Sequence, residues 1–139
     1  MSSRNIKDAH PTLQARYKGA LRHFKKYVWM AKRFEIKISC VSRTFTEQAK
    51  LYAQGRTEPG QIVTYCDGYQ NKSKHQKDKN GYSRAIDFFV VNKKTGKAIW
   101  KYHPATWLFI KLCKEVGLEC GYFWEMKDSF HVQMFDGDR

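Results

Sequence analysis

The chain has 139 residues and carries 26 lysines and arginines against 13 aspartates and glutamates, a formal net charge of +13. This length is typical of one domain, so we expect residues 1–139 to form a single, monomeric unit. No apolar run approaches the roughly 18 residues needed to cross a membrane, and the first residues lack the apolar segment of a signal peptide. We therefore expect synthesis in the cytoplasm, and partners that are polyanions: nucleic acid, anionic lipid or acidic cell-wall polymer.

The first predicted elements are a long basic helix and a short strand. Apolar residues recur at steps of three and four over residues 12–34, with lysines and arginines on much of the remaining surface. Residues 36–41, IKISCV, alternate between apolar and polar side chains as a half-buried strand does.

A second helix is predicted over residues 44–55, TFTEQAKLYAQG. Thr46 is the expected N-cap, with Glu47 in the first turn and Gly55 at the C-terminal end. Residues 56–68 should form a loop with a brief extended piece.

The second half of the chain predicts a hairpin, a helix and a last strand. Residues 85–91, AIDFFVV, are rich in β-branched and aromatic side chains, and the turn 92–97 leads to a partner strand at 98–102. An apolar helix is expected over 104–116, and SFHVQMF at 129–135 should be a strand. This order predicts an α+β fold, a small antiparallel sheet with helices on one side.

Four cysteines are present, and no two of them form a Cys-x-x-Cys pair, so a cysteine zinc ribbon is not expected. In the absence of a secretion signal we also expect no disulfide, and we interpret the four as buried or half-buried thiols. They are Cys40, Cys66, Cys113 and Cys120.

Each of the two late strands carries one polar side chain of chemical interest. Alternation places Asp87 on a face with Ala85 and Phe89, and His131 on a face with Gln133. Burying a carboxylate on an apolar strand is costly unless the group is paired or binds a metal. Two interpretations stay open here: a wet edge strand or an Asp–His or Asp–Arg pair, and a metal site.

His75 could complete such a metal site. A hydrolytic zinc needs three nitrogen or oxygen ligands and one open position for water, which two histidines and Asp87 would provide. A further carboxylate, not a ligand, must take a proton from the water, and Asp128 is the available candidate. The chain has no His-Glu-x-x-His segment, so the common helical zinc-protease arrangement is excluded.

The motifs Ser73-x-His75, Ala85-x-Asp87 and Asp128-x-x-His131-x-Gln133 together resemble the zinc D-Ala-D-Ala carboxypeptidase and L-alanyl-D-glutamate endopeptidase family. Residues 42–64, SRTFTEQAKLYAQGRTEPGQIVT, are similar to the endopeptidase branch, which includes phage endolysins. The resemblance covers about residues 36–134 and implies the hedgehog/D-Ala-D-Ala-peptidase fold.

The resemblance also implies roles for individual residues. One zinc ion would be bound by His75, Asp87 and His131, and Asp128 would be the general base. Arg43 would stabilise the oxyanion, with a surface salt bridge as the alternative. The remaining residues would contact substrate or support the ligands: Ser73, Gln133, Tyr122 and Trp124.

The sequence departs from the family pattern in three places. Eleven residues separate His75 from Asp87, where the family has six, so residues 77–82, KDKNGY, contain an insertion of about five residues. If the insertion were placed differently, Asn80 would fall at the first ligand position, and it is a poor zinc ligand. Ser83 stands where glycine is usual, and residues 117–124, GLECGYFW, replace a different family segment.

The favoured function is a zinc-dependent peptidase that cleaves peptidoglycan stem peptides between L-Ala and D-Glu, acting as a phage lysis enzyme on the wall after release into the periplasm. The alternatives are a D-Ala-D-Ala carboxypeptidase, a basic nucleic-acid-binding domain and a metal-binding structural protein.

Overall fold

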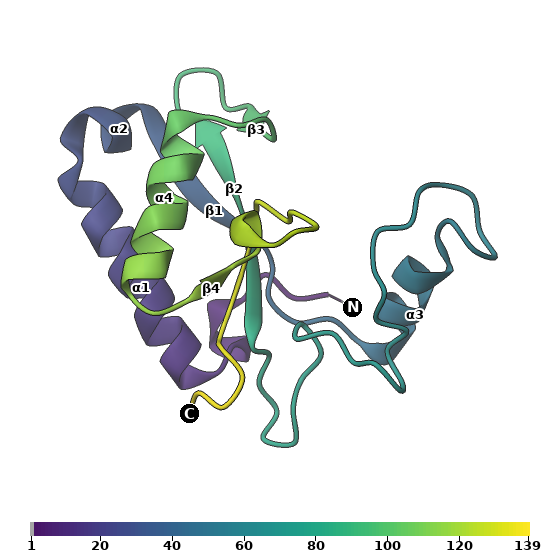
Figure 1. Ribbon diagram of the computed structural model, residues 1–139. Helices are drawn as coiled ribbons and strands as arrows, with labels where there is room; N and C mark the ends of the chain where they lie inside the picture. The colour runs from purple at the N-terminus through teal and green to yellow at the C-terminus, as the bar shows by residue number, and fades with distance from the viewer. Residues whose placement is uncertain (1) are drawn as a thin grey trace.

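The computed structural model describes residues 2–139 (Figure 1). The helices are α1 (Pro11–Lys26), α2 (Val28–Arg33), α3 (Phe45–Ala53) and α4 (Pro104–Glu115), with 3₁₀ turns at Ile6–Asp8 and Gly121–Phe123. The strands are β1 (Phe34–Cys40), β2 (Ala85–Asn92), β3 (Ala98–Ile99), β4 (Glu119–Cys120) and β5 (His131–Gln133).

The sheet has the order β1-β2-β5-β4, and β3 pairs with β2 beside this path. Each of these pairings is antiparallel. The α+β class and the antiparallel sheet expected from the sequence are therefore confirmed.

The core lies between one face of this sheet and helices α1 and α4. Phe88 of β2 is fully buried, and its ring lies 4.9 Å from that of Phe109 on α4. Tyr17 of α1 packs on the same Phe109 ring at 5.5 Å. Figure 1 shows α1, α2 and α4 gathered on one side, whereas α3 stands apart from them with its connecting loops. Asp87 alternates with the core residues of β2, so it points to the face that these helices leave uncovered.

Two details of the predicted helices are wrong. The helix expected over residues 12–34 is interrupted at Tyr27, whose φ of −84° and ψ of 77° are not helical. The cap of α3 is Thr44 and not Thr46: the Thr44 hydroxyl accepts from the Glu47 N–H at 3.2 Å, and the Glu47 carboxylate accepts from the Thr44 N–H at 3.0 Å. This reciprocal pair needs threonine and glutamate three residues apart, which only Thr44 satisfies.

Two of the predicted strands are shorter than expected, whereas β1 and β2 are each one residue longer than predicted. The hairpin partner predicted over 98–102 is reduced to the two residues of β3, and β5 has three residues. The extended piece expected within residues 56–68 forms no strand, and β4 was not predicted because two residues carry no periodicity. Within residues 2–139, no helix has the length and apolarity needed to pass through a bilayer.

Candidate metal centre

The register between β2 and β5 brings Asp87 and His131 together. The two residues lie directly opposite each other in the antiparallel pair. Their side chains therefore share a face, and His131 Nδ1 lies 2.9 Å from Asp87 Oδ1. The juxtaposition expected from strand alternation is found.

His75 reaches the same carboxylate from an irregular segment between α3 and β2. Its Nε2 lies 3.2 Å from Asp87 Oδ2, and its ring centroid lies 5.1 Å from that of His131. The backbone is held on both sides, because the His75 carbonyl accepts from the Arg43 N–H at 2.8 Å and the His75 N–H donates to the Ser73 hydroxyl at 3.2 Å. Ser73 thus orients the loop that carries His75.

The hydrogen bonds of the two imidazoles define which ring nitrogens face Asp87 with a lone pair. His75 Nδ1 lies 3.0 Å from the carbonyl oxygen of Val41, which can only accept, so Nδ1 carries the proton. His131 Nε2 lies 2.9 Å from Gln133 Oε1, so this nitrogen carries the proton in the second ring. When both rings are neutral, His75 Nε2 and His131 Nδ1 therefore each direct a lone pair at the Asp87 carboxylate.

This arrangement suits a divalent cation. His75 is only 2% exposed, and its Nε2 lies 3.2 Å from Asp87 Oδ2 without forming a well-oriented hydrogen bond to it. Two imidazole lone pairs and a carboxylate repel one another unless the rings gain a second proton or a cation lies among them. Two nitrogens and one oxygen form a ligand set that zinc accepts.

The shifted pKa values of His75 and Asp87 show that bound protons relieve the same repulsion. Burial alone would lower the pKa of His75, but the Asp87 carboxylate and Cys40 outweigh it and raise that pKa to about 9. Burial alone would raise the pKa of Asp87, but the adjacent imidazoles of His131 and His75 hold it well below its usual range. The site thus attracts positive charge.

A chain of hydrogen bonds behind His131 fixes its tautomer. The Gln133 amide donates through Nε2 to Glu119 Oε1 at 3.3 Å, which directs Gln133 Oε1 toward His131. Trp124 Nε1 donates to the other oxygen of Glu119 at 2.8 Å. Outer hydrogen bonds of this kind orient metal-ligating histidines. Gln133 thus contacts His131 on the side away from Asp87, and its supporting role stays a prediction. Glu119 was not anticipated.

Asp128 lies at the open side of the site. Its Oδ2 is 3.9 Å from His131 Nδ1, and its side chain is 57% exposed. Partial desolvation raises the pKa of Asp128 above its usual value, and the charge of Asp87 adds to this effect while His131 opposes it. Gly121 sits against it so closely that an added Cβ would collide with the Asp128 backbone oxygen. The unusual segment 117–124 thus includes a glycine that permits this approach.

Arg43 lies over the same carboxylate. Its Nη2 is 3.8 Å from Asp87 Oδ2, and its Nη1 donates to Gln48 Oε1 at 2.8 Å. The Arg43 side chain is 16% exposed, so the alternative of a surface salt bridge does not describe it.

The two aromatic residues of segment 117–124 differ in their relation to the ligands. The Trp124 ring centroid lies 5.2 Å from that of His131, so Trp124 forms part of the wall of the site. Tyr122 instead packs on Trp107 of α4, with ring centroids 5.1 Å apart.

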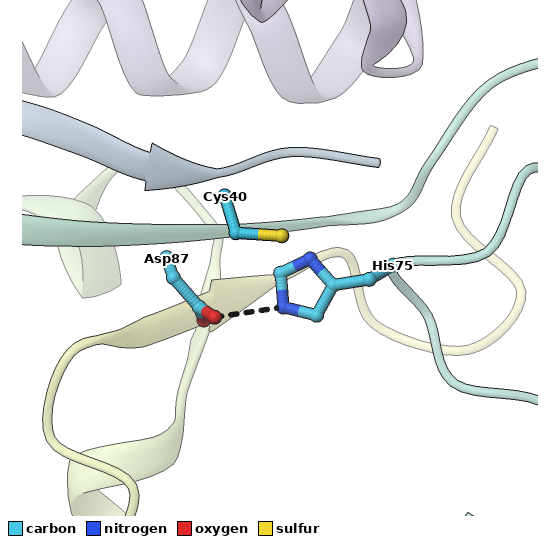
Figure 2. A group of neighbouring side chains, drawn as sticks. All are labelled: Cys40, His75 and Asp87. Carbon is cyan, nitrogen blue, oxygen red and sulfur yellow. Dashed lines mark ion pairs between the residues drawn. The ribbon is translucent and has the colours of Figure 1, made fainter. Parts of the chain in front are cut away.

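Two overlapping groups of potential metal ligands share Asp87, and His75 and His131 fall in different groups. Among residues 2–139, the ligand atoms lie within 4.8 Å of one another in Cys40, His75 and Asp87, and likewise in Asp87, Asp128 and His131. Figure 2 shows the first group, with the sulfur of Cys40 and the carboxylate of Asp87 both turned toward the His75 ring. The sequence analysis treated Cys40 as an ordinary buried thiol and did not place it at the site.

The inserted residues 77–82 form a turn that closes on itself. Asp78 Oδ1 accepts from the N–H groups of Asn80 at 2.9 Å and Tyr82 at 3.2 Å, and the Asp78 N–H donates to the Tyr82 carbonyl at 2.9 Å. Arg84 Nε adds an ion pair to Asp78 Oδ2 at 3.2 Å. None of these contacts involves a proposed metal ligand.

No family model matches the chain. A search of curated proteins finds the peptidoglycan L-alanyl-D-glutamate endopeptidase CwlK of Bacillus subtilis (strain 168), which is 39% identical over 101 residues. The match covers 66% of this chain and 56% of the relative, so the chain corresponds to little more than half of that protein. The expected kinship is confirmed: over this segment the chain is homologous to a peptidoglycan L-alanyl-D-glutamate endopeptidase, and this homology implies the peptidase fold seen here.

Proposed function

We propose that this protein is a zinc-dependent peptidoglycan endopeptidase that cleaves the stem peptide between L-Ala and D-Glu. The observation that carries the proposal is the convergence of His75 Nε2, His131 Nδ1 and the Asp87 carboxylate, each nitrogen turned inward by a hydrogen bond on the far side of its ring. The activity of the homologue, a peptidoglycan L-alanyl-D-glutamate endopeptidase, supplies the substrate class.

The site residues divide the work of amide hydrolysis. A zinc ion held by His75, Asp87 and His131 would supply Lewis-acid activation of water and of the scissile carbonyl. Asp128 would accept the proton of the attacking water and return it to the leaving amine, a task that its raised pKa and exposed position suit. Arg43 would donate hydrogen bonds to the carbonyl oxygen as negative charge develops there.

Digestion of purified peptidoglycan tests this function. The protein should release new N-terminal D-Glu and C-terminal L-Ala ends, identified by mass spectrometry, and a chelator should stop the reaction until zinc is added back. Release of free D-Ala without these ends would instead support the D-Ala-D-Ala carboxypeptidase alternative. Intact stem peptides after digestion with zinc-loaded protein would overturn the proposal.

The net charge of +13 favours a second candidate, a nucleic-acid-binding domain. Binding of this kind weakens steeply as salt rises, because counterions are released from the phosphates. DNA binding measured over a range of salt concentrations distinguishes the two, since the peptidase proposal predicts no specific affinity for DNA.

We also propose a place of action: the cell wall, reached after release from the cytoplasm, as in phage lysis. The basic surface supports this by favouring an anionic envelope. Bacteria that express the chain in the cytoplasm should grow intact, and the same cells should lyse when it is exported with a signal peptide. Equal growth in both cases would argue against a lytic role.

A further inference from the structure

Cys40 reaches the metal centre through an irregularity in β1. Ile36 and Ile38 lie opposite Val90 and Phe88, on the face of the sheet that packs on the helices. A regular continuation would pair Cys40 with the next core residue of β2. The register instead shifts by one residue between Ile38 and Cys40, so that Cys40 lies opposite Asp87.

This β-bulge changes the face on which Cys40 lies. Side chains alternate along a strand, so an extra residue transfers those that follow to the other side of the sheet. Cys40 thereby leaves the core face and joins the face that carries Asp87. In Figure 2 its sulfur projects from the strand toward His75.

The surroundings of the sulfur are those of a ligand position. Sγ accepts a hydrogen bond from Arg43 Nη2 at 3.7 Å, and the thiol donates to the Ser42 carbonyl oxygen at 3.8 Å. It is also within 4.8 Å of the ligand atoms of His75 and Asp87. His75 Nε2, which is buried 3.2 Å from Asp87 Oδ2 without a well-oriented hydrogen bond, is a second sign that a cation belongs here.

We propose that Cys40 is a fourth ligand for the same metal ion, and that the site exists in an open form with three ligands and a closed form in which the thiolate is also bound. The inference rests on the proposed metal site. A tetrahedral zinc ion with four protein ligands has no position left for water, so the closed form is inactive. The sulfur also gives the site an affinity for thiophilic cations that a set of two histidines and one aspartate lacks.

Closing the site exchanges a proton for a metal–sulfur bond. The Cys40 thiol loses its proton to the solvent, and the resulting thiolate binds the ion, so no oxidant or reductant is needed. Metal binding to the wild-type protein should therefore release more protons than binding to a variant that lacks this thiol.

Cobalt(II) titration of the metal-free full chain tests the proposal without relying on peptidoglycan hydrolysis. Wild type should show ligand-field bands together with a thiolate-to-cobalt charge-transfer band. Cys40→Ser should keep the ligand-field bands, lose the charge-transfer band and bind cobalt less tightly. Cys66→Ser is the matched control, since Cys66 is half-buried and outside both ligand groups, and it should retain both features.

The outcomes separate this inference from the proposed function. Ligand-field bands without charge transfer in wild type would overturn Cys40 ligation and leave the three-ligand site standing. No cobalt binding at all would overturn the metal site and the inference together. If Cys40→Ser does not fold, as judged by circular dichroism, X-ray absorption of cobalt-loaded wild type and Cys66→Ser still decides: the absence of a metal-bound sulfur atom in both proteins would contradict the proposal.

Discussion

The candidate metal centre has two halves that are built differently. Asp87 and His131 stand on paired strands, where sheet register alone sets them opposite each other. His75 stands on an irregular segment and is positioned by separate hydrogen bonds to Val41, Ser73 and Arg43. A strand pair gives a precise distance from few residues, whereas the loop half needs several polar partners to define one ring.

The largest expected effect comes from a change that breaks both halves at once. Asp87 bridges the two imidazoles, so Asp87→Asn should abolish zinc binding and reduce peptidoglycan hydrolysis to background. Equilibrium dialysis with zinc measures the first effect and the digest measures the second. A folded Asp87→Asn protein that still binds zinc as wild type does would refute the shared role of this carboxylate.

Replacing Asp128, the proposed general base, tests the part of the site that is open to solvent. Asp128→Asn should keep zinc and fold but slow hydrolysis by about 10²- to 10⁴-fold, the usual contribution of general acid–base catalysis. Asp136→Asn is the matched control, because Asp136 is an exposed carboxylate paired with Lys74. Similar rates for the two variants would remove Asp128 from the mechanism.

A smaller effect should follow when the outer support of His131 is removed. Gln133→Leu leaves His131 Nε2 without its acceptor, and zinc affinity should fall by about 10- to 100-fold. Glu119→Gln should have a weaker effect of the same kind, since an amide keeps one acceptor oxygen and can accept from Gln133 or Trp124 but not from both. Zinc competition titrations compare the three proteins; unchanged affinity in Gln133→Leu would mean that register alone positions His131.

Shortening the insertion tests whether the loop half depends on it. Removing about five residues within 77–82 should leave zinc affinity unchanged and alter the free energy of unfolding by about 1 kcal/mol or less, because loop length has a weak effect on stability. Zinc titration and urea unfolding check both values. Lost zinc binding in a folded protein would place the insertion within the site.

The smallest expected effect is a pH-dependent change in the free energy of unfolding, caused by Asp78 in the same loop. Although burial opposes it, hydrogen bonds from Tyr82 and Arg84 hold the pKa of Asp78 below its usual 3.8. A carboxyl whose pKa is lower in the folded chain stabilises it above the unfolded pKa, and this contribution is lost as pH falls through the folded value. Asp78→Asn should therefore cost less than about 1 kcal/mol at neutral pH and nothing in strong acid. An equal difference at both pH values, measured by urea unfolding, would contradict this origin.

Sequence patterns predicted the features that depend on local periodicity. Alternation placed Asp87 and His131 on the faces where they meet, and the ordered motifs identified His75. The sequence did not predict Glu119 at the site, because its position depends on β4, a strand of only two residues. The sequence did not predict Cys40 at the site either, because regular alternation would place its side chain on the core face of the sheet. A one-residue bulge moves it to the opposite face. The break at Tyr27 likewise interrupts a pattern that reads as one continuous helix.

The self-closed turn at residues 77–82 separates chain length from ligand spacing. Metal binding depends on the positions of His75 Nε2 and Asp87 Oδ2, which are 3.2 Å apart. It does not depend on how many residues lie between them in the sequence. Search patterns with a fixed interval between these two ligands would reject this chain although its geometry qualifies. The same turn offers protein engineers a place to graft a peptide, such as an affinity tag or a wall-binding segment, beside the proposed catalytic site without moving its side chains.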